Sequence, residues 1–233
     1  MTIRAIMEPG AKSYAAFFDL DKTVLSINSG PALVHEAYKR GLMSTSDLLN
    51  AIYLSFLYKF NLRDPSLIVS GMGKWLKGIT VDEADALAEH VVNDYLVDAI
   101  RPEIYSEIKL HKGNNAEIVI LSSAIIQLCK PLGSVIGADN IICTVMEVMD
   151  GVFTGAAENN FCFGDEKRVR LFKYCEMKNY SLSKAFYYSD SISDLSALEV
   201  VGHPVCVQPD RKLTRISHKH GWRILQLKIV SDK

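Results

Sequence analysis

Short apolar runs separated by longer helical stretches form the main pattern of this chain. Each run is bounded by polar or turn residues, which is typical of buried strands. The predicted strands are Tyr14–Phe18, Glu117–Leu121, Ile141–Thr144, Ala185–Ser189 and Pro204–Val207. Helical patterns between successive strands favour parallel pairing. The chain is therefore predicted to have an α/β fold with a doubly wound, Rossmann-like parallel sheet.

The stretch between the first two predicted strands is far longer than one crossover needs. Almost all of it has helical patterns, which are Pro31–Gly41, Ser46–Asn61, Asp64–Lys77 and a helix from Thr80 to about Ile100. Thr80-Val-Asp-Glu83 is a capping box that opens the last helix. We therefore expect a helical cap domain at 29–101, inserted into a core domain formed by 1–28 and 102–233. Within the core, Asp150-Gly151 between two apolar segments predicts a β-hairpin over Val145–Thr154.

Composition limits the classes of function. The 233 residues are 48% hydrophobic and 23% charged, with a net charge of −1 and no basic tract, so nucleic-acid binding is not expected. No run has the length of a membrane span, and the N-terminus lacks the apolar centre of a secretory signal, so we expect a cytoplasmic protein. Five cysteines without a Cys-x-x-Cys pair predict buried free thiols. The oligomeric state is left open.

Polar side chains follow three of the predicted strands. Asp19 and Asp21 follow the first strand, and the alternation of strand side chains directs both to the same side. Two carboxylates this close repel each other, and a hard cation such as Mg²⁺ would remove that cost. Ser122 and Ser123 follow the second strand and precede a helical stretch, where hydroxyl and N–H groups can bind an anion. Another acidic pair, Asp190 and Asp194, follows the strand that ends at Ser189.

A lysine completes this set. Lys167 lies near the start of the helical stretch 166–177, where it could hold a phosphate as a point charge. Each group alone has an ordinary explanation, since serines cap helices and acids favour helix N-termini. Ligands of open α/β sheets bind at the carboxyl ends of the strands, so we expect the three acidic and hydroxyl-bearing segments and Lys167 to meet in one crevice.

With these motifs the chain resembles the haloacid dehalogenase superfamily of phosphohydrolases, in its phosphoserine-phosphatase-like branch. Asp19-x-Asp21-x-Thr23 resembles the first motif of that family, Ser122 the second and Lys167 the third. Asp190 with Asp194 resembles the fourth motif. The likeness extends from about Ser13 to about Leu225, and Gln208-Pro-Asp210 is part of it.

The resemblance implies a role for each matching residue. Asp19 would be the nucleophile that forms an aspartyl phosphate, and Asp21 would be the general acid and then the base. Mg²⁺ would be held by Asp19, the backbone carbonyl of Asp21 and Asp190, while Asp194 would orient Lys167 or a water on the metal. The expected contacts to the phosphate and the rest of the substrate are Thr23, Asn28, Ser122, Ser123 and Lys167. The implied enzyme is a phosphoric monoester hydrolase with a mobile cap.

Two other functions stay open at this point. A phosphotransferase of the same family would pass the phosphoryl group to an alcohol instead of water. A non-catalytic module would bind phospho-ligands, or a partner through the cap, without turnover. A dehalogenase is disfavoured because it has no use for a second acid at Asp21.

The substrate is expected to be a small phosphomonoester. In phosphoserine phosphatases an acidic residue nine positions after the nucleophile binds the substrate amine, and this chain has Asn28 there. No residue clearly matches their cap arginine, although Arg63 and Arg101 are candidates. Phosphoserine, other small phosphomonoesters and lipid-like phosphates all stay candidates. The aromatic stretch Ile52–Phe60 is expected to be helix-bundle core, with contact to lipid or an apolar substrate tail as the alternative.

Overall fold

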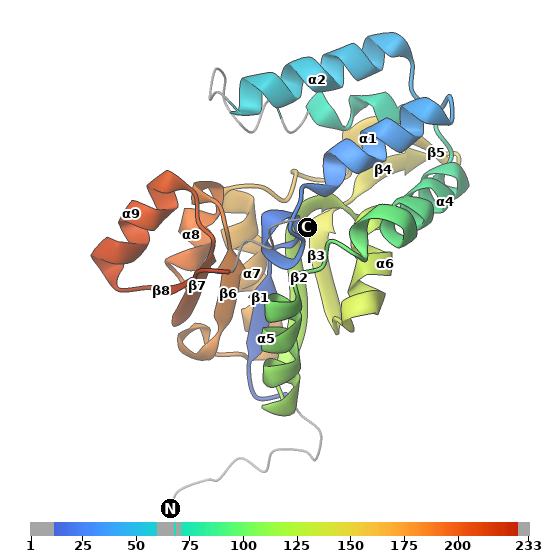
Figure 1. The fold of residues 1–233 in the computed structure, drawn as a ribbon. Coiled ribbons are helices and arrows are strands. Elements are labelled where there is room, and N and C mark those ends of the chain that lie inside the picture. The colour runs from blue at the N-terminus through green and yellow to red at the C-terminus, as the bar shows by residue number, and fades with distance from the viewer. Residues whose placement is uncertain (1–11, 60–67, 69–70, 228–233) are drawn as a thin grey trace, which may run out of the picture.

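A six-stranded parallel sheet forms the centre of the molecule (Figure 1). The computed structural model describes residues 12–59, 68 and 71–227. The strand order is β3-β2-β1-β6-β7-β8. The strands are β1 (Ala15–Phe18), β2 (Glu117–Ile125), β3 (Asn140–Thr144), β6 (Phe186–Ser189), β7 (His203–Val207) and β8 (Arg223–Leu225). The predicted α/β fold with a parallel sheet is confirmed. Strand β8 was not predicted, because three residues beginning with an arginine give no apolar run.

Side-chain alternation in β1 supplies both faces of the sheet. Ala16 and Phe18 belong to one apolar cluster, and Ala15 and Phe17 belong to another. The first cluster is covered by α5 (Pro102–Gly113) and α6 (Ile126–Ile136). The second is covered by α7 (Asp165–Lys178), α8 (Leu195–Leu198) and α9 (Arg211–His220). Helices on both faces bury the whole central strand, which is why all four of its residues are inaccessible to solvent.

Helices α1 (Ser29–Lys39), α2 (Thr45–Lys59) and α4 (Val81–Val91) come from the long insertion after β1. Figure 1 shows α1 and α2 beyond the end of the sheet where the strands finish. The predicted capping box is present, with Glu83 N–H donating to Thr80 Oγ1 at 3.2 Å and Thr80 N–H to Glu83 Oε2 at 3.0 Å. None of the helices in the described ranges is both long and apolar enough to cross a bilayer.

One helix prediction in the insertion needs correction, and a second is described only in part. The helix from Thr80 ends at Val91 and not near Ile100, because the chain loosens into the wider turn Val92–Leu96 and then returns to the core, where Ile100 pairs with Leu25. The predicted helix Asp64–Lys77 lies largely outside the described residues. Its described residues 68, 71 and 72 are helical, and Lys74–Leu76 forms one further, tighter turn.

Contacts join the insertion to the core at more places than its two ends. Leu87 and Val91 of α4 share one apolar cluster with Leu128 and Leu132 of α6. An antiparallel bridge between Leu25 and Ile100 joins the segment that enters the insertion to the segment that leaves it. Because α4 is packed on the core, the part of the insertion that stands away from the sheet is mainly α1 and α2. The domain boundaries at 28/29 and 101/102 stay a prediction.

The predicted β-hairpin is present as β4 (Met146–Met149) and β5 (Val152–Ala157). Its turn has φ of 51° at Asp150 and 80° at Gly151, as a two-residue type I′ turn requires. The hairpin is bonded to the insertion, since Gly78 N–H donates to the Phe153 carbonyl and Phe153 N–H to the Ile79 carbonyl, both at 2.9 Å. A segment far along the chain therefore supports the base of the insertion.

Candidate active site

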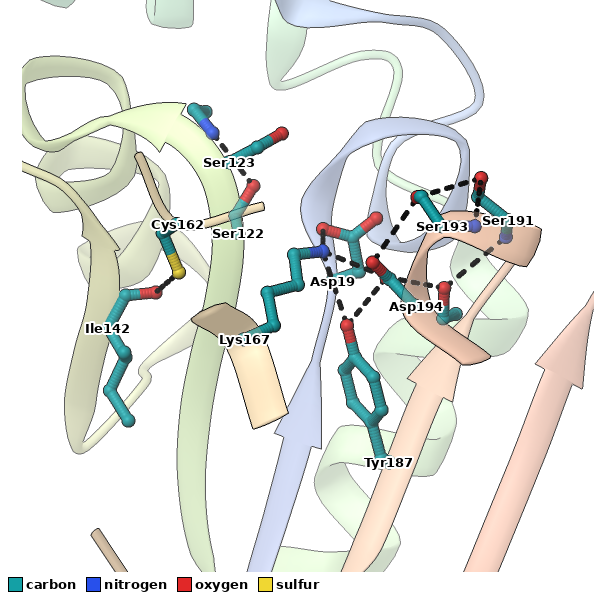
Figure 2. A network of polar contacts seen from close by, with 12 residues as sticks. Asp19, Ser122, Ser123, Ile142, Cys162, Lys167, Tyr187, Ser191, Ser193 and Asp194 are labelled. Carbon is teal, nitrogen blue, oxygen red and sulfur yellow. Dashed lines mark hydrogen bonds and ion pairs between the residues drawn. The ribbon is translucent and has the colours of Figure 1, made fainter. Parts of the chain in front are cut away.

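Asp19 lies directly after β1, at the carboxyl edge of the sheet (Figure 2). Its backbone N–H donates to the Tyr188 carbonyl at 3.0 Å, which fixes it against the neighbouring strand β6. Lys167, in the first turn of α7, extends its Nζ to within 2.9 Å of Asp19 Oδ1. The predicted first and third motifs therefore meet as a buried ion pair.

Asp194 holds the other side of the same ammonium group. Its Oδ2 accepts hydrogen bonds from Lys167 Nζ at 2.8 Å, Tyr187 Oη at 2.6 Å and Ser189 Oγ at 2.7 Å. Lys167 Nζ also donates to Tyr187 Oη at 3.2 Å. Lys167 and Asp194 are only 2% and 1% exposed, so the ammonium is held in one orientation between Asp19 and Asp194.

The site carries more negative than positive charge. Burial raises the pKa of Asp19 to about 8, against the attraction of Lys167 and with further repulsion from Asp194 and Asp190. Burial, followed by repulsion from Asp194, raises the pKa of Asp190 to about 7. Burial alone would lower the pKa of Lys167, but the attraction of Asp19 and Asp194 raises it well above its ordinary value. One ammonium therefore faces three carboxyl groups.

This donor set fits a hard divalent cation. Asp19 and Asp190 follow the adjacent strands β1 and β6, and one lysine cannot neutralise them together with Asp194. In the part of the chain that the structure describes, no three His, Cys, Asp or Glu side chains are grouped around one metal position. That finding is compatible with two carboxylates completed by a backbone carbonyl such as that of Asp21. Asp194 Oδ2 already accepts three hydrogen bonds, so its place is beside Lys167.

Asp21 and Thr23 lie in the turn Leu20–Val24 that follows Asp19. Asp21 Oδ1 accepts a hydrogen bond at 2.9 Å from the backbone N–H of Ser29, the first residue of α1. Burial raises the pKa of Asp21 although the hydrogen bond to Ser29 opposes it. Thr23 is fully buried, and its Oγ1 has no hydrogen-bond partner among the described residues. Asp21 therefore connects the site to the first helix of the insertion.

Ser122 and Ser123 lie on β2, next to β1 at the same edge of the sheet (Figure 2). The expected helix start directly after them is wrong, because β2 continues to Ile125 and α6 begins at Ile126. Ser122 is buried and its Oγ accepts from Ala124 N–H at 3.2 Å. The carbonyl of Ser123 accepts from Thr144 Oγ1 at 2.9 Å, which joins β2 to the end of β3.

Two residues considered for substrate recognition are found at helix starts. Asn28 precedes α1, is exposed, and makes no side-chain hydrogen bond to the helix. Arg101 precedes α5 and donates from Nε to the Leu25 carbonyl at 3.3 Å. Burial lowers the pKa of Arg101, while Glu103 and Asp190 oppose that shift. Arg63 lies outside the described residues.

Helix α2 exposes part of the aromatic stretch expected to be bundle core. Leu49, Ile52, Tyr53 and Phe56, spaced along one side of the helix, are each more than half exposed, at 62%, 57%, 53% and 52%. Leu57, in contrast, is buried. For Ile52, Tyr53 and Phe56, which belong to that stretch, the core interpretation is wrong, because the helix is apolar on both sides and only one side packs inward. Contact of this surface with lipid or an apolar substrate tail stays a prediction.

The sequence reasoning missed two members of the site. Tyr187 and Ser189 belong to β6, where the apolar pattern indicated only core. Both donate to Asp194 from buried positions. The available signal was a pair of hydroxyl-bearing side chains in a buried strand directly before an acidic pair, since buried hydroxyls need partners. The five cysteines are buried and free, as expected.

Comparisons with known proteins agree with this geometry. The model of the family described as haloacid dehalogenase-like hydrolase matches residues 16–199. A protein of Streptomyces azureus named for inhibition of morphological differentiation is 33% identical over 216 residues, covering 91% of this chain and 77% of its own. A probable phosphatase of Mycobacterium tuberculosis is 31% identical over 215 residues, covering 91% and 74%. A phosphoserine phosphatase of the same organism is 27% identical over 225 residues, covering 93% and 71%.

Solved structures show the same fold. A protein of unknown function from Bordetella pertussis Tohama I has a TM-score of 0.84 at 22% identity, covering 93% of this chain and all of its own. A phosphoserine phosphatase with an analogue of a phospho-aspartyl intermediate has a TM-score of 0.68 at 15% identity, covering 91% and 92%. With the buried Asp19–Lys167–Asp194 arrangement at the edge of its parallel sheet, the chain belongs to the haloacid dehalogenase-like hydrolase family, in the phosphatase branch that resembles phosphoserine phosphatases.

Proposed function

We propose that this chain is a Mg²⁺-dependent phosphatase that hydrolyses a small phosphomonoester through an aspartyl phosphate on Asp19. The observation that carries this proposal is the position of Lys167 Nζ, which lies 2.9 Å from Asp19 and 2.8 Å from Asp194 at the end of β1. An ammonium held beside a carboxylate at that edge can neutralise a phosphoryl group while the carboxylate attacks it.

In the first step the Asp19 carboxylate forms a bond to phosphorus, and the bond from phosphorus to the leaving alcohol oxygen breaks. Asp21 gives its proton to that oxygen, and burial shifts the pKa of Asp21 upward, in the direction that favours proton donation. Lys167 balances the negative charge on the non-bridging oxygens. The product of this step is the alcohol and a phosphorylated Asp19.

In the second step a water molecule attacks phosphorus and Asp21 accepts its proton. The bond between phosphorus and the Asp19 oxygen then breaks, which releases inorganic phosphate and restores the carboxylate. Mg²⁺, held by Asp19, the Asp21 carbonyl and Asp190, would supply positive charge to the phosphoryl oxygens in both steps. Asp194 keeps Lys167 in place throughout.

The remaining site residues are proposed to orient the substrate. Ser122 Oγ and the Ser123 N–H would donate to phosphoryl oxygens from β2, the strand beside Asp19. The unpartnered buried hydroxyl of Thr23 is a donor available to the Asp19 carboxylate or the phosphoryl group. Asn28, exposed at the start of α1, would contact the alcohol part of the substrate.

A phosphoserine-like substrate is one candidate within this class. It is supported by relatives named phosphoserine phosphatase, while another relative, from Neisseria meningitidis, is named histidinol-phosphatase. Asn28 has no charge to pair with a substrate amine, so preference for an uncharged or differently placed group is equally compatible with the site. We propose that the insertion 29–101 acts as the cap that selects among such substrates.

The experiment is a panel of phosphomonoesters, including phosphoserine, histidinol phosphate and an aryl phosphate, assayed with Mg²⁺ for the wild type and for Asp19→Asn. Asp19→Asn keeps an oxygen for Lys167 but removes the nucleophile, so activity on every substrate should fall roughly 10³-fold or more. Circular dichroism should show an unchanged fold. Activity of the variant within tenfold of wild type on the aryl phosphate would exclude Asp19 as the nucleophile.

The same panel separates the two alternatives. With glycerol or another alcohol added, a phosphotransferase would give a phosphorylated alcohol in place of part of the inorganic phosphate. A binding module would bind phosphomonoesters without releasing phosphate from any of them.

A further inference from the structure

Asp210 lies outside the four motif segments, on the connection between β7 and α9, yet it contacts the segment that carries Asp190 and Asp194. It precedes α9, and its Oδ1 accepts from Lys212 N–H at 2.8 Å and Leu213 N–H at 2.9 Å. Its Oδ2 accepts from Ile192 N–H at 2.7 Å. Its own backbone N–H donates to the Asp190 carbonyl at 2.9 Å.

The two oxygens of this carboxylate do different things. Capping a helix needs one acceptor oxygen, which serine, threonine or asparagine also supplies. The hydrogen bond that Oδ2 accepts from Ile192 N–H plays no part in capping α9. Because the acceptor is a carboxylate, this bond is stronger than one between neutral groups. Capping therefore accounts for Oδ1 and leaves the contact to the 190–194 loop as a separate feature.

The 190–194 loop is held by bonds within it, by strand β6 and by Asp210. Within it, Ser193 N–H donates to Ser191 Oγ at 3.2 Å and Asp194 N–H to the Ser191 carbonyl at 3.1 Å, which shapes the short turn Ile192–Asp194. Ser189 and Tyr187 of β6 tie the loop to the sheet, through Asp194 and the Ser191 N–H. Asp210 ties the same loop to the start of α9 at two points, through the Asp190 carbonyl and the Ile192 N–H.

We propose that Asp210 is a positioning residue that anchors the 190–194 loop to the start of α9, and so sets the direction of the Asp190 carboxylate toward the cation and of Asp194 toward Lys167. The inference rests on the proposed function, because it assigns Asp210 an effect on Mg²⁺ binding. Asp210 acts only through the loop and touches neither substrate nor reacting atoms.

Asp210→Ser is the main test, because serine keeps an oxygen for capping α9 but cannot reach Ile192. Asp210→Asn is the conservative variant. Its amide nitrogen is a donor, so it cannot replace the carboxylate oxygen that accepts from Ile192 or the one that caps α9. Thr214→Val is the matched control. It removes the bonds from Thr214 Oγ1 to the carbonyls of Pro209 and Asp210, at 3.1 Å and 2.8 Å, without changing the Asp210 side chain.

Three quantities are measured: NMR-detected hydrogen exchange of the Ile192 and Leu213 amides, Mg²⁺ binding by calorimetry, and the Mg²⁺ dependence of aryl phosphate turnover. In Asp210→Ser, exchange at Ile192 should be at least roughly tenfold faster, because a charge-assisted bond is lost, while exchange at Leu213 stays near wild type. Mg²⁺ affinity should fall about tenfold, as expected for loss of an outer-shell partner, and kcat at saturating Mg²⁺ should stay within about threefold. Thr214→Val should match wild type in Mg²⁺ affinity.

Unchanged Ile192 exchange in Asp210→Ser would overturn the anchoring, and unchanged Mg²⁺ affinity in a variant with fast Ile192 exchange would overturn the effect on the cation. Equal loss in Asp210→Ser and Thr214→Val would assign Asp210 to helix capping alone. If the wild type neither binds Mg²⁺ nor releases phosphate, the proposed function fails and the assigned effect on the cation fails with it. The Ile192 measurement would still decide whether the loop is anchored by Asp210.

Discussion

His111, on the inner side of α5, is buried with both ring nitrogens bonded. Tyr188 Oη donates to Glu107 Oε2 at 2.7 Å, so it accepts from His111 Nε2–H at 2.8 Å. Nδ1 is left to accept from Tyr14 Oη at 2.8 Å. Glu107 is paired in turn with Arg223 at 2.6 Å. In the neutral imidazole Nε2 therefore carries the proton and Nδ1 is the acceptor, so both ring nitrogens are satisfied without a charge.

This arrangement predicts a loss of stability in mild acid. Burial lowers the pKa of His111 from 6.5 to about 4, against the attraction of Glu107 and with repulsion from Arg223 and His203. As the pH falls through 6.5, the unfolded chain binds a proton that the folded chain refuses until about pH 4. The free energy of unfolding should therefore fall across that window, by on the order of 3 kcal/mol from this residue.

Urea denaturation at several pH values between 7 and 4 measures this effect. His111→Gln should be less stable than wild type at pH 7 but should show a flatter pH dependence between 6.5 and 4. His218→Gln, at an exposed position, is the control and should keep the wild-type slope. A wild-type slope in His111→Gln would assign the acid sensitivity to other groups.

Asn28 offers a clean test of substrate selection, because its exposed side chain makes no bond to α1. Asn28→Ala should leave the fold intact and change the ranking of kcat/KM among phosphomonoesters more than the rate on a small aryl phosphate. Asp190→Asn is the comparison, and it should depress all substrates alike because the cation serves every one of them. A uniform loss in Asn28→Ala would place Asn28 in the common chemistry and contradict the proposed division between cap and core.

At single positions, the sequence predicted the residues whose chemistry has few alternatives. Lys167 Nζ lies 2.9 Å from Asp19 Oδ1 and 2.8 Å from Asp194 Oδ2, as convergence at the strand ends required. The apolar pattern did not predict the bond from Tyr187 to Asp194. A tyrosine in a buried strand packs its ring in the core, and the pattern does not show which acceptor its hydroxyl finds. The double contact of Asp210 also had no sequence signal beyond the cap it provides.

At the scale of elements, one glycine allows two segments to lie close together. Gly202 is the residue before β7, and it packs against the turn Leu182–Lys184. Gly202 N–H donates to the Leu182 carbonyl at 2.7 Å, and a Cβ at Gly202 would collide with the Ser183 carbonyl oxygen. Backbone atoms cannot rotate aside as a side chain can. The strand and the turn therefore stay close only while position 202 has no side chain.

Gly202→Ala should lower the free energy of unfolding by about 2 kcal/mol or more, because the backbone must shift to relieve the collision. Gly113→Ala, at the end of α5 with open space around the added methyl group, should change it by less than about 1 kcal/mol. Thermal or urea unfolding of both variants provides the measurement. Equal stability of the two variants would show that the turn moves without cost.

Element types were predictable where periodicity was strong, and element ends were not. β2 runs on through Ser122 and Ser123 because pairing with β3 resumes at Ile125, which is a long-range effect. α4 ends early because the chain must return to pair with Leu25. The contact of the hairpin with Gly78 and Ile79 joins distant segments, and no local pattern indicates it.

At the scale of the whole molecule, the excess of carboxylates over lysine at the site predicts metal dependence of both activity and stability. Activity should disappear in EDTA and return with Mg²⁺, because the carboxylates would otherwise repel a phosphate dianion. A cation that binds only the folded chain should also raise its stability, by about 2.7 kcal/mol at a hundred times Kd. Full turnover after thorough chelation, or a melting temperature insensitive to Mg²⁺, would contradict the proposed cation.

The central position of β1 has a consequence for how the protein is made. β1 leaves the ribosome first among the strands, but its neighbour β2 begins at Glu117 and its other neighbour β6 at Phe186. Asp19 and Lys167 are 148 positions apart in the chain. Such non-local pairing is slow, and it cannot begin until β2 has been synthesised or be complete until β6 has followed. During translation the apolar Ala15–Phe18 segment must therefore stay unpaired for a long interval, which makes it a site where a chaperone would protect the nascent chain.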